Sequence, residues 1–177
     1  VTRSVTLRDE RWPIAGAFTI ARGAKTEAHV VLAEVGENGA LGRGEAVPYA
    51  RYGESVEAVM AQMEGARAAV TAGASRQDLL NLLPPGAARN ALDCALWDLE
   101  AKLSGTPAWE AAGRARLDPV KTCYTISLGA PEGRAEAARA AARRPMLKLK
   151  IGGPGDLDRV EAVRAAAPKT RLVVDAN

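Results

Sequence analysis

Between residues 120 and 175 the chain alternates short apolar segments with helical segments, and this alternation limits the possible folds more than any other feature. Strands are predicted at 120–128, 146–151 and 171–175, with helices at 131–143 and 156–166. A helix between two strands carries the chain back to the start of the sheet, so the three strands are expected to run parallel. The pattern is typical of a doubly wound sheet or of a β/α barrel.

The preceding residues follow a different pattern. Apolar and polar residues alternate at 1–11 and 28–35, and Asn38-Gly39 predicts a hairpin turn into a strand at 41–47. Residues 18–27 contain a glycine and mixed charges, which predicts a loop. Ser55 is an expected N-cap for a helix to about residue 72. A further helix at 87–104 carries a stripe of Leu92, Leu96, Leu99 and Leu103.

Composition excludes several classes of protein. The net charge is only +3 in 177 residues, without a basic run, so no nucleic-acid partner is expected. We expect no membrane partner either, because no apolar stretch is long enough to cross a bilayer and no secretory leader is evident. Cys94 and Cys123 lack metal-site spacing, and both are predicted to be small buried residues in a reducing compartment. These features predict a cytoplasmic protein.

Polar residues gather at the carboxyl ends of the three predicted parallel strands. In order these are Thr125 and Ser127, Lys148 and Lys150, and Asp175 and Asn177. Each pair is spaced two residues apart, so its members share one face of their strand. Taken singly, such residues also act as helix caps, turn residues or a solvated strand edge. Their occurrence on three consecutive strands favours a site, because parallel strands end at one edge of the sheet.

The chemistry of this set suggests removal of a proton. A lysine beside a second lysine is harder to protonate, and its lowered pKa makes it a usable base. Asp175 could hold a divalent cation such as Mg²⁺, which takes carboxylate oxygens. Together a base and a cation can remove the proton next to a carboxylate, because the cation stabilises the negative charge that develops.

Five ordered stretches resemble the enolase superfamily, in its muconate-lactonising subgroup, and most closely the L-Ala-D/L-Glu dipeptide epimerases. They are G-R-G-E-A at 42–46, the helical segment A-R-N-A-L-D-C-A-L-W-D-L-E-A-K with Pro107 after it, Y-T-I-S at 124–127, K-L-K at 148–150 and V-V-D-A-N at 173–177. The resemblance implies an α/β protein with an α+β capping domain, followed by the first strands of a modified (β/α)₇β TIM-type barrel. The expected domains are 1–116 and 117–177, and the chain is expected to be the N-terminal part of a longer one.

The resemblance also implies catalytic roles. Lys150 matches the base that transfers the proton, and Lys148 the neighbour that contacts the substrate carboxylate. Asp175 matches the first ligand of an Mg²⁺ ion, whose remaining ligands would lie beyond Asn177, together with the base on the opposite face of the substrate. Such sites are known to combine a lysine base with Mg²⁺.

Further residues are implied to contact the substrate. Thr125 falls where epimerases touch it, Asn177 is the polar neighbour of the metal ligand, and Arg22 matches a specificity position in a loop over the barrel mouth. The implied partner is a small carboxylate such as a dipeptide, and a homo-oligomer is possible. The alternatives are o-succinylbenzoate synthase, N-acylamino acid racemase or muconate cycloisomerase of the same superfamily, or a non-catalytic enolase-like binding protein.

Overall fold

The computed structural model describes residues 2–20 and 23–176, which fall into two compact units. The first unit comprises Val1–Trp12 and Glu27–Leu117, and the second comprises Pro13–Thr26 and Asp118–Asn177. The later boundary follows Leu117, beside the boundary expected from the sequence. No sequence pattern indicated that residues 13–26 belong with the second unit.

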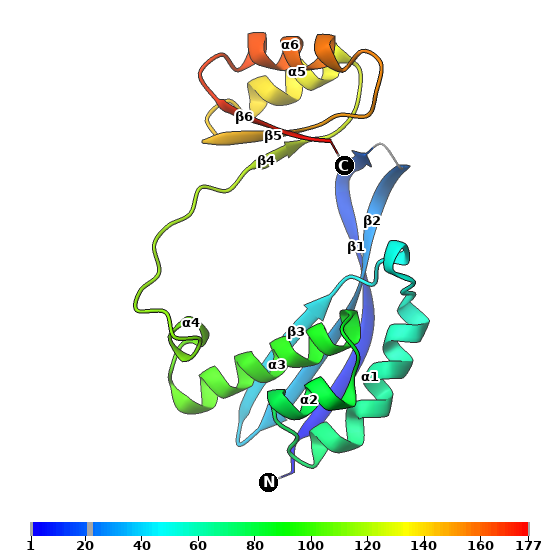
Figure 1. The fold of residues 1–177 in the computed structure, drawn as a ribbon, viewed down its shortest axis with the longest axis vertical. Helices are drawn as coiled ribbons and strands as arrows, with labels where there is room; N and C mark the ends of the chain where they lie inside the picture. Colours follow the sequence, from blue (N-terminus) through cyan, green and yellow to red (C-terminus); the bar gives the residue numbers. More distant parts are fainter. Residues whose placement is uncertain (1, 21–22, 177) are drawn as a thin grey trace. The chain divides into compact units, whose positions relative to one another are not determined.

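A three-stranded sheet with the order β1-β2-β3 supports the first unit (Figure 1). Its strands are β1 (Ser4–Ile20), β2 (Gly23–Glu37) and β3 (Ala40–Ala46). The predicted turn between β2 and β3 is confirmed, because Asn38 and Gly39 both have positive φ angles, of 49° and 81°. The predicted loop at 18–27 is wrong, since strand structure extends to Ile20 and resumes at Gly23. Most of the residues at 18–20 and 23–27 are exposed, so apolar and polar side chains do not alternate along these strands.

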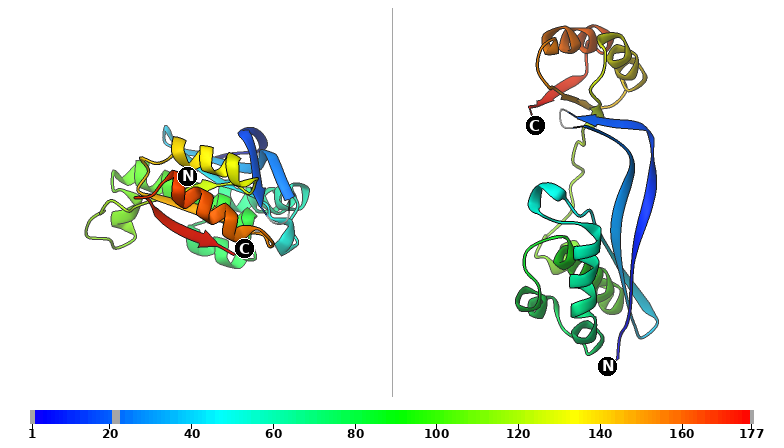
Figure 2. Two further views of the ribbon diagram at one scale, coloured as in Figure 1. Left: turned by 90° about the horizontal axis from the view of Figure 1, so that it is seen from above. Right: turned by 90° about the vertical axis from the view of Figure 1, so that its right-hand side faces the viewer.

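Helices pack on one side of this sheet, as the right-hand view of Figure 2 shows. They are α1 (Val56–Thr71), α2 (Arg76–Leu82) and α3 (Ala87–Ser104), with the short η1 (Ala50–Tyr52) and α4 (Ala108–Ala111) at the connections. The predicted cap is confirmed, because the Ser55 side chain accepts a hydrogen bond from the Ala58 amide. No helix among the described residues has both the length and the apolar character needed to span a bilayer.

The contact between β3 and α3 is close because two glycines leave room for the helix. A Cβ atom added to Gly44 would lie 2.0 Å from the Ala91 carbonyl oxygen, and one added to Gly42 would lie 2.1 Å from that of Ala95. These distances are far below van der Waals contact, so only glycine fits at either position. The G-R-G stretch therefore serves the packing of the first unit.

The outer positions of α3 differ from the prediction. Leu92, Leu96 and Leu99 are fully buried as expected, whereas Leu103 is 40% exposed because the core ends before the last helical turn. The prediction that both cysteines are buried is wrong. Cys94 lies on the face of α3 opposite the leucine stripe. Cys123 lies outside any strand, although the strand predicted at 120–128 included it.

The second unit contains a parallel sheet with the order β4-β5-β6, covered on one face by two helices (Figure 1). Its elements are β4 (Tyr124–Ile126), α5 (Pro131–Ala140), β5 (Met146–Lys150), α6 (Asp156–Ala166) and β6 (Arg171–Asp175). The predicted βαβαβ order is confirmed. However, β4 is shorter than the predicted 120–128, because only its three residues pair with β5. Ile126, Leu147 and Leu149 form the core beneath the helices.

Candidate active site

The two lysines of β5 lie on the face of the sheet that the helices leave uncovered. Leu147 and Leu149 are fully buried in the core beneath α5 and α6. Because side chains alternate along a strand, Lys148 and Lys150 extend from the opposite face. Their side chains are 32% and 12% exposed, so Lys150 is the more enclosed of the two. The polar face predicted for this strand is therefore present.

Asp175 at the end of β6 binds both lysines. It is the Cα partner of Lys150 in the parallel pairing of β5 with β6. The Nζ atoms of Lys148 and Lys150 each lie 2.7 Å from the same carboxylate oxygen, Asp175 Oδ2. The Lys150 ammonium group donates a hydrogen bond to it. Three of the predicted site residues thus meet at one carboxylate.

Thr125 extends the same polar face onto β4. It is the Cα partner of Lys148 in the pairing of β4 with β5, and it is half-buried. Partners in register across parallel strands carry their side chains on one face of the sheet. The side chains predicted for the site on β4, β5 and β6 therefore lie on one face of the sheet.

Two other predicted residues, Arg22 and Asn177, lie outside the described residues. The strand that leads toward Arg22 is nevertheless attached to the end of β4. The Leu128 amide donates a hydrogen bond to the Thr19 carbonyl oxygen at 3.1 Å, and the Ser127 hydroxyl donates one to the Ala17 carbonyl at 3.4 Å. Ser127 thus orders the chain rather than contributing its hydroxyl to the lysine–aspartate group.

The pKa of Lys148 shifts in the direction opposite to the one expected for two neighbouring lysines. Two adjacent ammonium groups were expected to lower a lysine pKa through repulsion. For Lys148 the direction is opposite, because its hydrogen bond to the Asp175 carboxylate raises the pKa. The Asp175 carboxylate, 2.7 Å from Lys148 Nζ, therefore favours the protonated form of this lysine.

Asp175 suits a divalent cation as one ligand, since Mg²⁺ prefers carboxylate oxygens. One carboxylate does not complete a metal site. Within residues 2–20 and 23–176 there is no group of three or more histidine, cysteine or acidic side chains that could hold a metal ion. The structure therefore offers one oxygen ligand of the right chemistry, already in contact with two lysines.

The connection after β5 is fixed by Asp156, a residue that sequence analysis did not connect with the site. Its Oδ2 accepts hydrogen bonds from the amides of Gly152 and Gly153, at 2.9 and 2.7 Å. Its Oδ1 lies 2.9 Å from the Arg159 guanidinium. Because this turn follows Lys150 directly, Asp156 stabilises the backbone next to the candidate base. An acidic residue shortly after a glycine-rich turn is the signal that could have predicted this contact.

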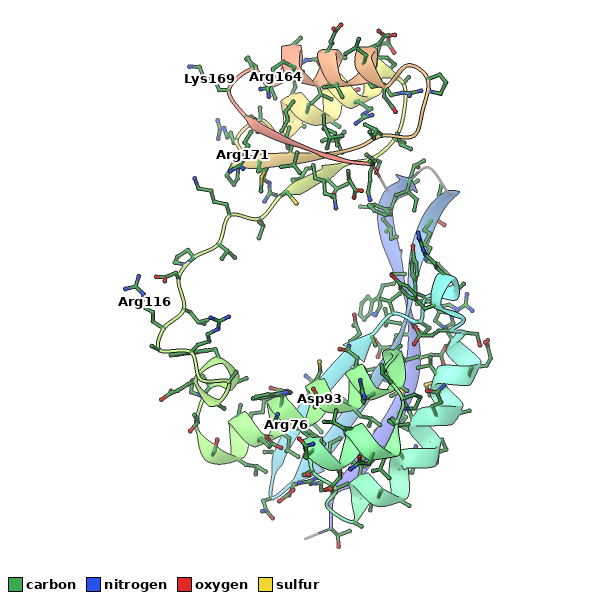
Figure 3. All side chains as sticks on the ribbon, in the orientation of Figure 1. Arg76, Asp93, Arg116, Arg164, Lys169 and Arg171 are labelled. Carbon is green, nitrogen blue, oxygen red and sulfur yellow. The ribbon has the colours of Figure 1, made fainter. Side chains whose placement is uncertain are left out.

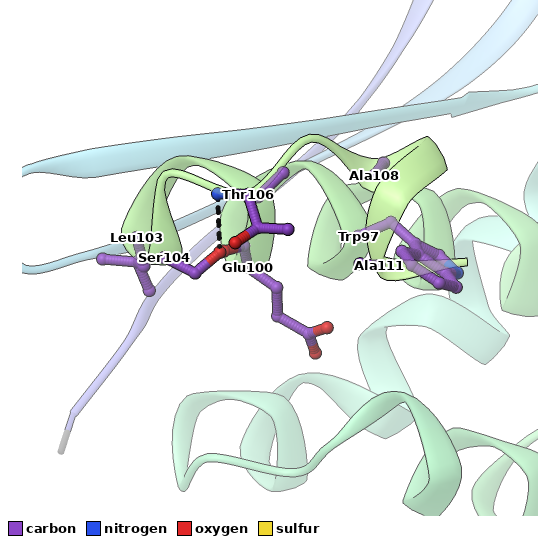
Figure 4. A pocket seen from close by; sticks show the side chains of 8 residues that line it. Trp97, Glu100, Leu103, Ser104, Thr106, Ala108 and Ala111 are labelled. Atoms are coloured by element: carbon purple, nitrogen blue, oxygen red, sulfur yellow. Dashed lines mark hydrogen bonds between the residues drawn. The ribbon is translucent and has the colours of Figure 1, made fainter. Parts of the chain in front are cut away.

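A cavity of about 460 Å³ lies elsewhere, in the first unit (Figure 4). It is lined by Trp97, Glu100, Ala101, Leu103, Ser104, Thr106, Ala108 and Ala111. The Arg76 guanidinium stacks over the Trp97 ring, 3.4 Å from its centroid. None of the predicted site residues lines this cavity.

The chain is similar to known proteins over nearly its whole length. Residues 2–113 match the sequence profile of the mandelate racemase / muconate lactonizing enzyme N-terminal domain. The chain is 41% identical over 177 residues to L-Ala-D/L-Glu epimerase from Escherichia coli K12, covering 99% of this chain and 55% of that protein. It thus spans about half the length of this relative.

Solved structures show the same likeness. An enolase family member from Agrobacterium tumefaciens with homology to dipeptide epimerases, solved with sodium and L-Ala-L-Glu bound, is 48% identical with a TM-score of 0.92, covering 99% of this chain and 54% of that one. A dipeptide epimerase from Cytophaga hutchinsonii, complexed with Mg and D-Ala-L-Val, is 26% identical with a TM-score of 0.86, covering 99% of this chain and 51% of that one. The fold, the ordered motifs and the profile match agree, and the chain belongs to the mandelate racemase / muconate lactonizing enzyme family of the enolase superfamily.

Proposed function

We propose that this chain is the N-terminal part of an Mg²⁺-dependent epimerase that acts on a dipeptide such as L-Ala-D/L-Glu. The observation that carries the proposal is the meeting of Lys148, Lys150 and Asp175 at the carboxyl ends of two parallel strands. The named activity of the E. coli relative and the L-Ala-L-Glu bound to the A. tumefaciens protein support the choice of substrate.

In the proposed reaction Lys150 removes the proton on the carbon next to the substrate carboxylate. It is the more enclosed of the two lysines, and its Nζ lies 2.7 Å from Asp175 at the end of the neighbouring strand. Lys148, nearer to solvent, contacts the carboxylate as a cation. Thr125 is in register with Lys148 and donates or accepts a hydrogen bond at the substrate.

Asp175 is proposed to hold the cation, which the C. hutchinsonii structure supports for the family by its bound Mg. When bound, Mg²⁺ would stabilise the negative charge that develops on the substrate carboxylate. Arg22 and Asn177 remain predicted substrate contacts. Epimerisation requires a base on each face of the substrate, and the resemblance predicts the second base beyond Asn177.

Solvent exchange of the substrate α-proton tests the proposal directly. The complete protein, stripped of metal and then supplied with Mg²⁺, should incorporate deuterium from D₂O into L-Ala-D-Glu and L-Ala-L-Glu and interconvert them. Absence of exchange with both dipeptides, in protein that is folded and loaded with Mg²⁺, would refute it. Faster exchange of N-acetylglutamate would favour the N-acylamino acid racemase alternative, and dipeptide binding without exchange would favour the non-catalytic one.

A further inference from the structure

Arg134 is a buried cation without a partner among the described residues. It lies in the first turns of α5 and is only 2% exposed. All three of its guanidinium nitrogens, Nε, Nη1 and Nη2, are inaccessible to solvent and form no hydrogen bond in the described part of the chain. The Nε atom of Arg159 in α6 is buried and unbonded in the same way. Four N–H-bearing nitrogens of two arginines thus lack an acceptor.

The charges around Arg134 do not balance. Its electrostatic neighbours are Arg159 and Asp156, both in the first turns of α6. Burial and the positive charge of Arg159 lower the pKa of Arg134. The Asp156 carboxylate is already engaged by the amides of Gly152 and Gly153 and by Arg159. Two guanidinium groups therefore face one carboxylate, which leaves one positive charge in excess.

Another arginine of α6 shows how this unit normally satisfies a guanidinium group. Arg164, at the opposite end of the helix, donates from Nη1 to the carbonyl oxygens of Ala167, Pro168 and Thr170 (Figure 3). Arginine is almost never fully buried unless it is paired, because an unpaired buried charge is costly. The contrast indicates that the partner of Arg134 is a group other than the residues around it.

The surroundings of Arg134 favour a small anion as this partner. Helices α5 and α6 pack on each other, and Arg134 and Arg159, from their first turns, are electrostatic neighbours. Unpaired amides at a helix start and the helix dipole favour negative charge. The neighbouring connection 152–155 has the sequence G-G-P-G and is exposed throughout, so displacement of this connection would open a route from solvent to nitrogens that are closed off in the described arrangement. A Cβ atom added to Gly153 would meet nothing within 4 Å, which leaves space at this connection.

We propose that Arg134 and Arg159 form a binding site for a small inorganic oxyanion of the phosphate or sulfate class, between the first turns of α5 and α6. A guanidinium fork binds such an oxyanion through two parallel N–H···O hydrogen bonds. The anion would supply acceptors to the buried nitrogens and neutralise the excess charge. This site is inferred from the second unit alone and does not depend on the proposed epimerase activity.

Thermal unfolding of the complete protein, titrated with phosphate at constant ionic strength maintained with chloride, tests the proposal. Phosphate should raise the unfolding temperature in a saturable manner, by roughly 5 °C at high occupancy. The Arg134→Met variant should lose this rise entirely, and without phosphate it should be at least as stable as the wild type, because an unpaired buried charge has been removed. Arg139→Met, on the exposed side of α5, should retain the full response.

The outcome that overturns the proposal is equally clear. If phosphate and chloride have equal effects, or if Arg134→Met lowers stability while the phosphate response persists, the site does not exist. Should Arg134→Met fail to fold, Arg134→Lys keeps the charge but not the planar fork and should weaken phosphate binding, measured by calorimetry, at least tenfold. Unchanged phosphate affinity in Arg134→Lys would also refute the site.

Discussion

Glu34 in the first unit and Asp175 in the second are both carboxylates flanked by two cations, and they use those cations differently. At Glu34 the guanidinium groups of Arg8 and Arg43 bind separate oxygens, Oε2 and Oε1, each at 2.7 Å. At Asp175 both lysines lie 2.7 Å from the single oxygen Oδ2. The arginines at Glu34 are largely exposed, whereas the lysines at Asp175 are mostly enclosed.

The difference separates a structural ion pair from a candidate reactive group. The Glu34 arrangement satisfies both carboxylate oxygens with fixed, permanently charged partners. In the Asp175 arrangement two cations crowd one acceptor, and lysine, unlike arginine, can lose its proton when its surroundings change. We therefore expect substitutions in the second unit to alter chemistry, and substitutions in the first unit to alter stability.

The largest effect is expected at Lys150. In the complete protein Lys150→Ala should lower deuterium exchange from one substrate epimer by about 10²–10⁴-fold, the contribution of a positioned base. The other epimer should still exchange its proton, because the base on the opposite face serves it. Lys148→Met is the matched variant on the same strand, and it should retain part of the exchange from both epimers. Wild-type exchange of both epimers by Lys150→Ala would show that this lysine is not the base.

The next effect concerns stability rather than chemistry. Gly44→Ala should destabilise the first unit by about 3 kcal/mol, because the new Cβ would overlap the Ala91 carbonyl oxygen of α3 and force β3 away from the helix. Gly65→Ala provides the control, since Gly65 lies in α1 with open space around it, and it should stabilise by about 0.5–1 kcal/mol. Denaturant unfolding measures both. Equal effects of the two substitutions would contradict the close packing of β3 on α3.

The first unit was the easier one to predict where local chemistry decides the structure. The Asn38-Gly39 turn and the Ser55 cap are specified by the residues themselves. The strand residues at 18–20 and 23–27 were missed because most of them are exposed, so their backbone pairing is not reflected in an alternation of apolar and polar side chains. The exposure of Cys94 follows from its position on α3, and a strict helical count would have revealed it.

The candidate site was predictable because strand alternation and parallel pairing are regular. Spacing by two residues placed Lys148 and Lys150 on one face, and the end of β6 brought Asp175 beside them. The sharing of one carboxylate oxygen depends on the register between β5 and β6, which no local pattern encodes. Arg134 was missed for a related reason: in an alanine-rich helix an arginine is expected to face solvent, and only the packing of α5 on α6 buries it.

Substitution of Arg22 tests its predicted role in choosing the substrate. Arg22→Ala should raise KM for L-Ala-L-Glu by roughly ten- to hundredfold, because a charge-assisted hydrogen bond is worth about 1.5–3 kcal/mol. A dipeptide with a neutral second residue should be far less affected. Steady-state kinetics of the complete protein with both substrates measure the difference. An equal loss for the two dipeptides would remove Arg22 from the specificity role.

The smallest effect is expected at Glu34, where the comparison began. Hydrogen bonds from Arg8 and Arg43 lower the pKa of the Glu34 carboxyl from 4.5 to about 2. A carboxyl whose pKa is depressed in the folded state stabilises the protein above its unfolded pKa, and it loses that contribution as the pH falls from about 4.5 to about 2. The contribution is small because water screens the two exposed arginines.

Glu34→Gln should therefore flatten the acid limb of the stability profile of the first unit while leaving α-proton exchange at neutral pH unchanged. Glu64→Gln, which removes the partner of Arg67 on the exposed surface of α1, is the control and should change that limb less. If Glu34→Gln abolished exchange at neutral pH, the separation between a structural pair in the first unit and a reactive group in the second would fail.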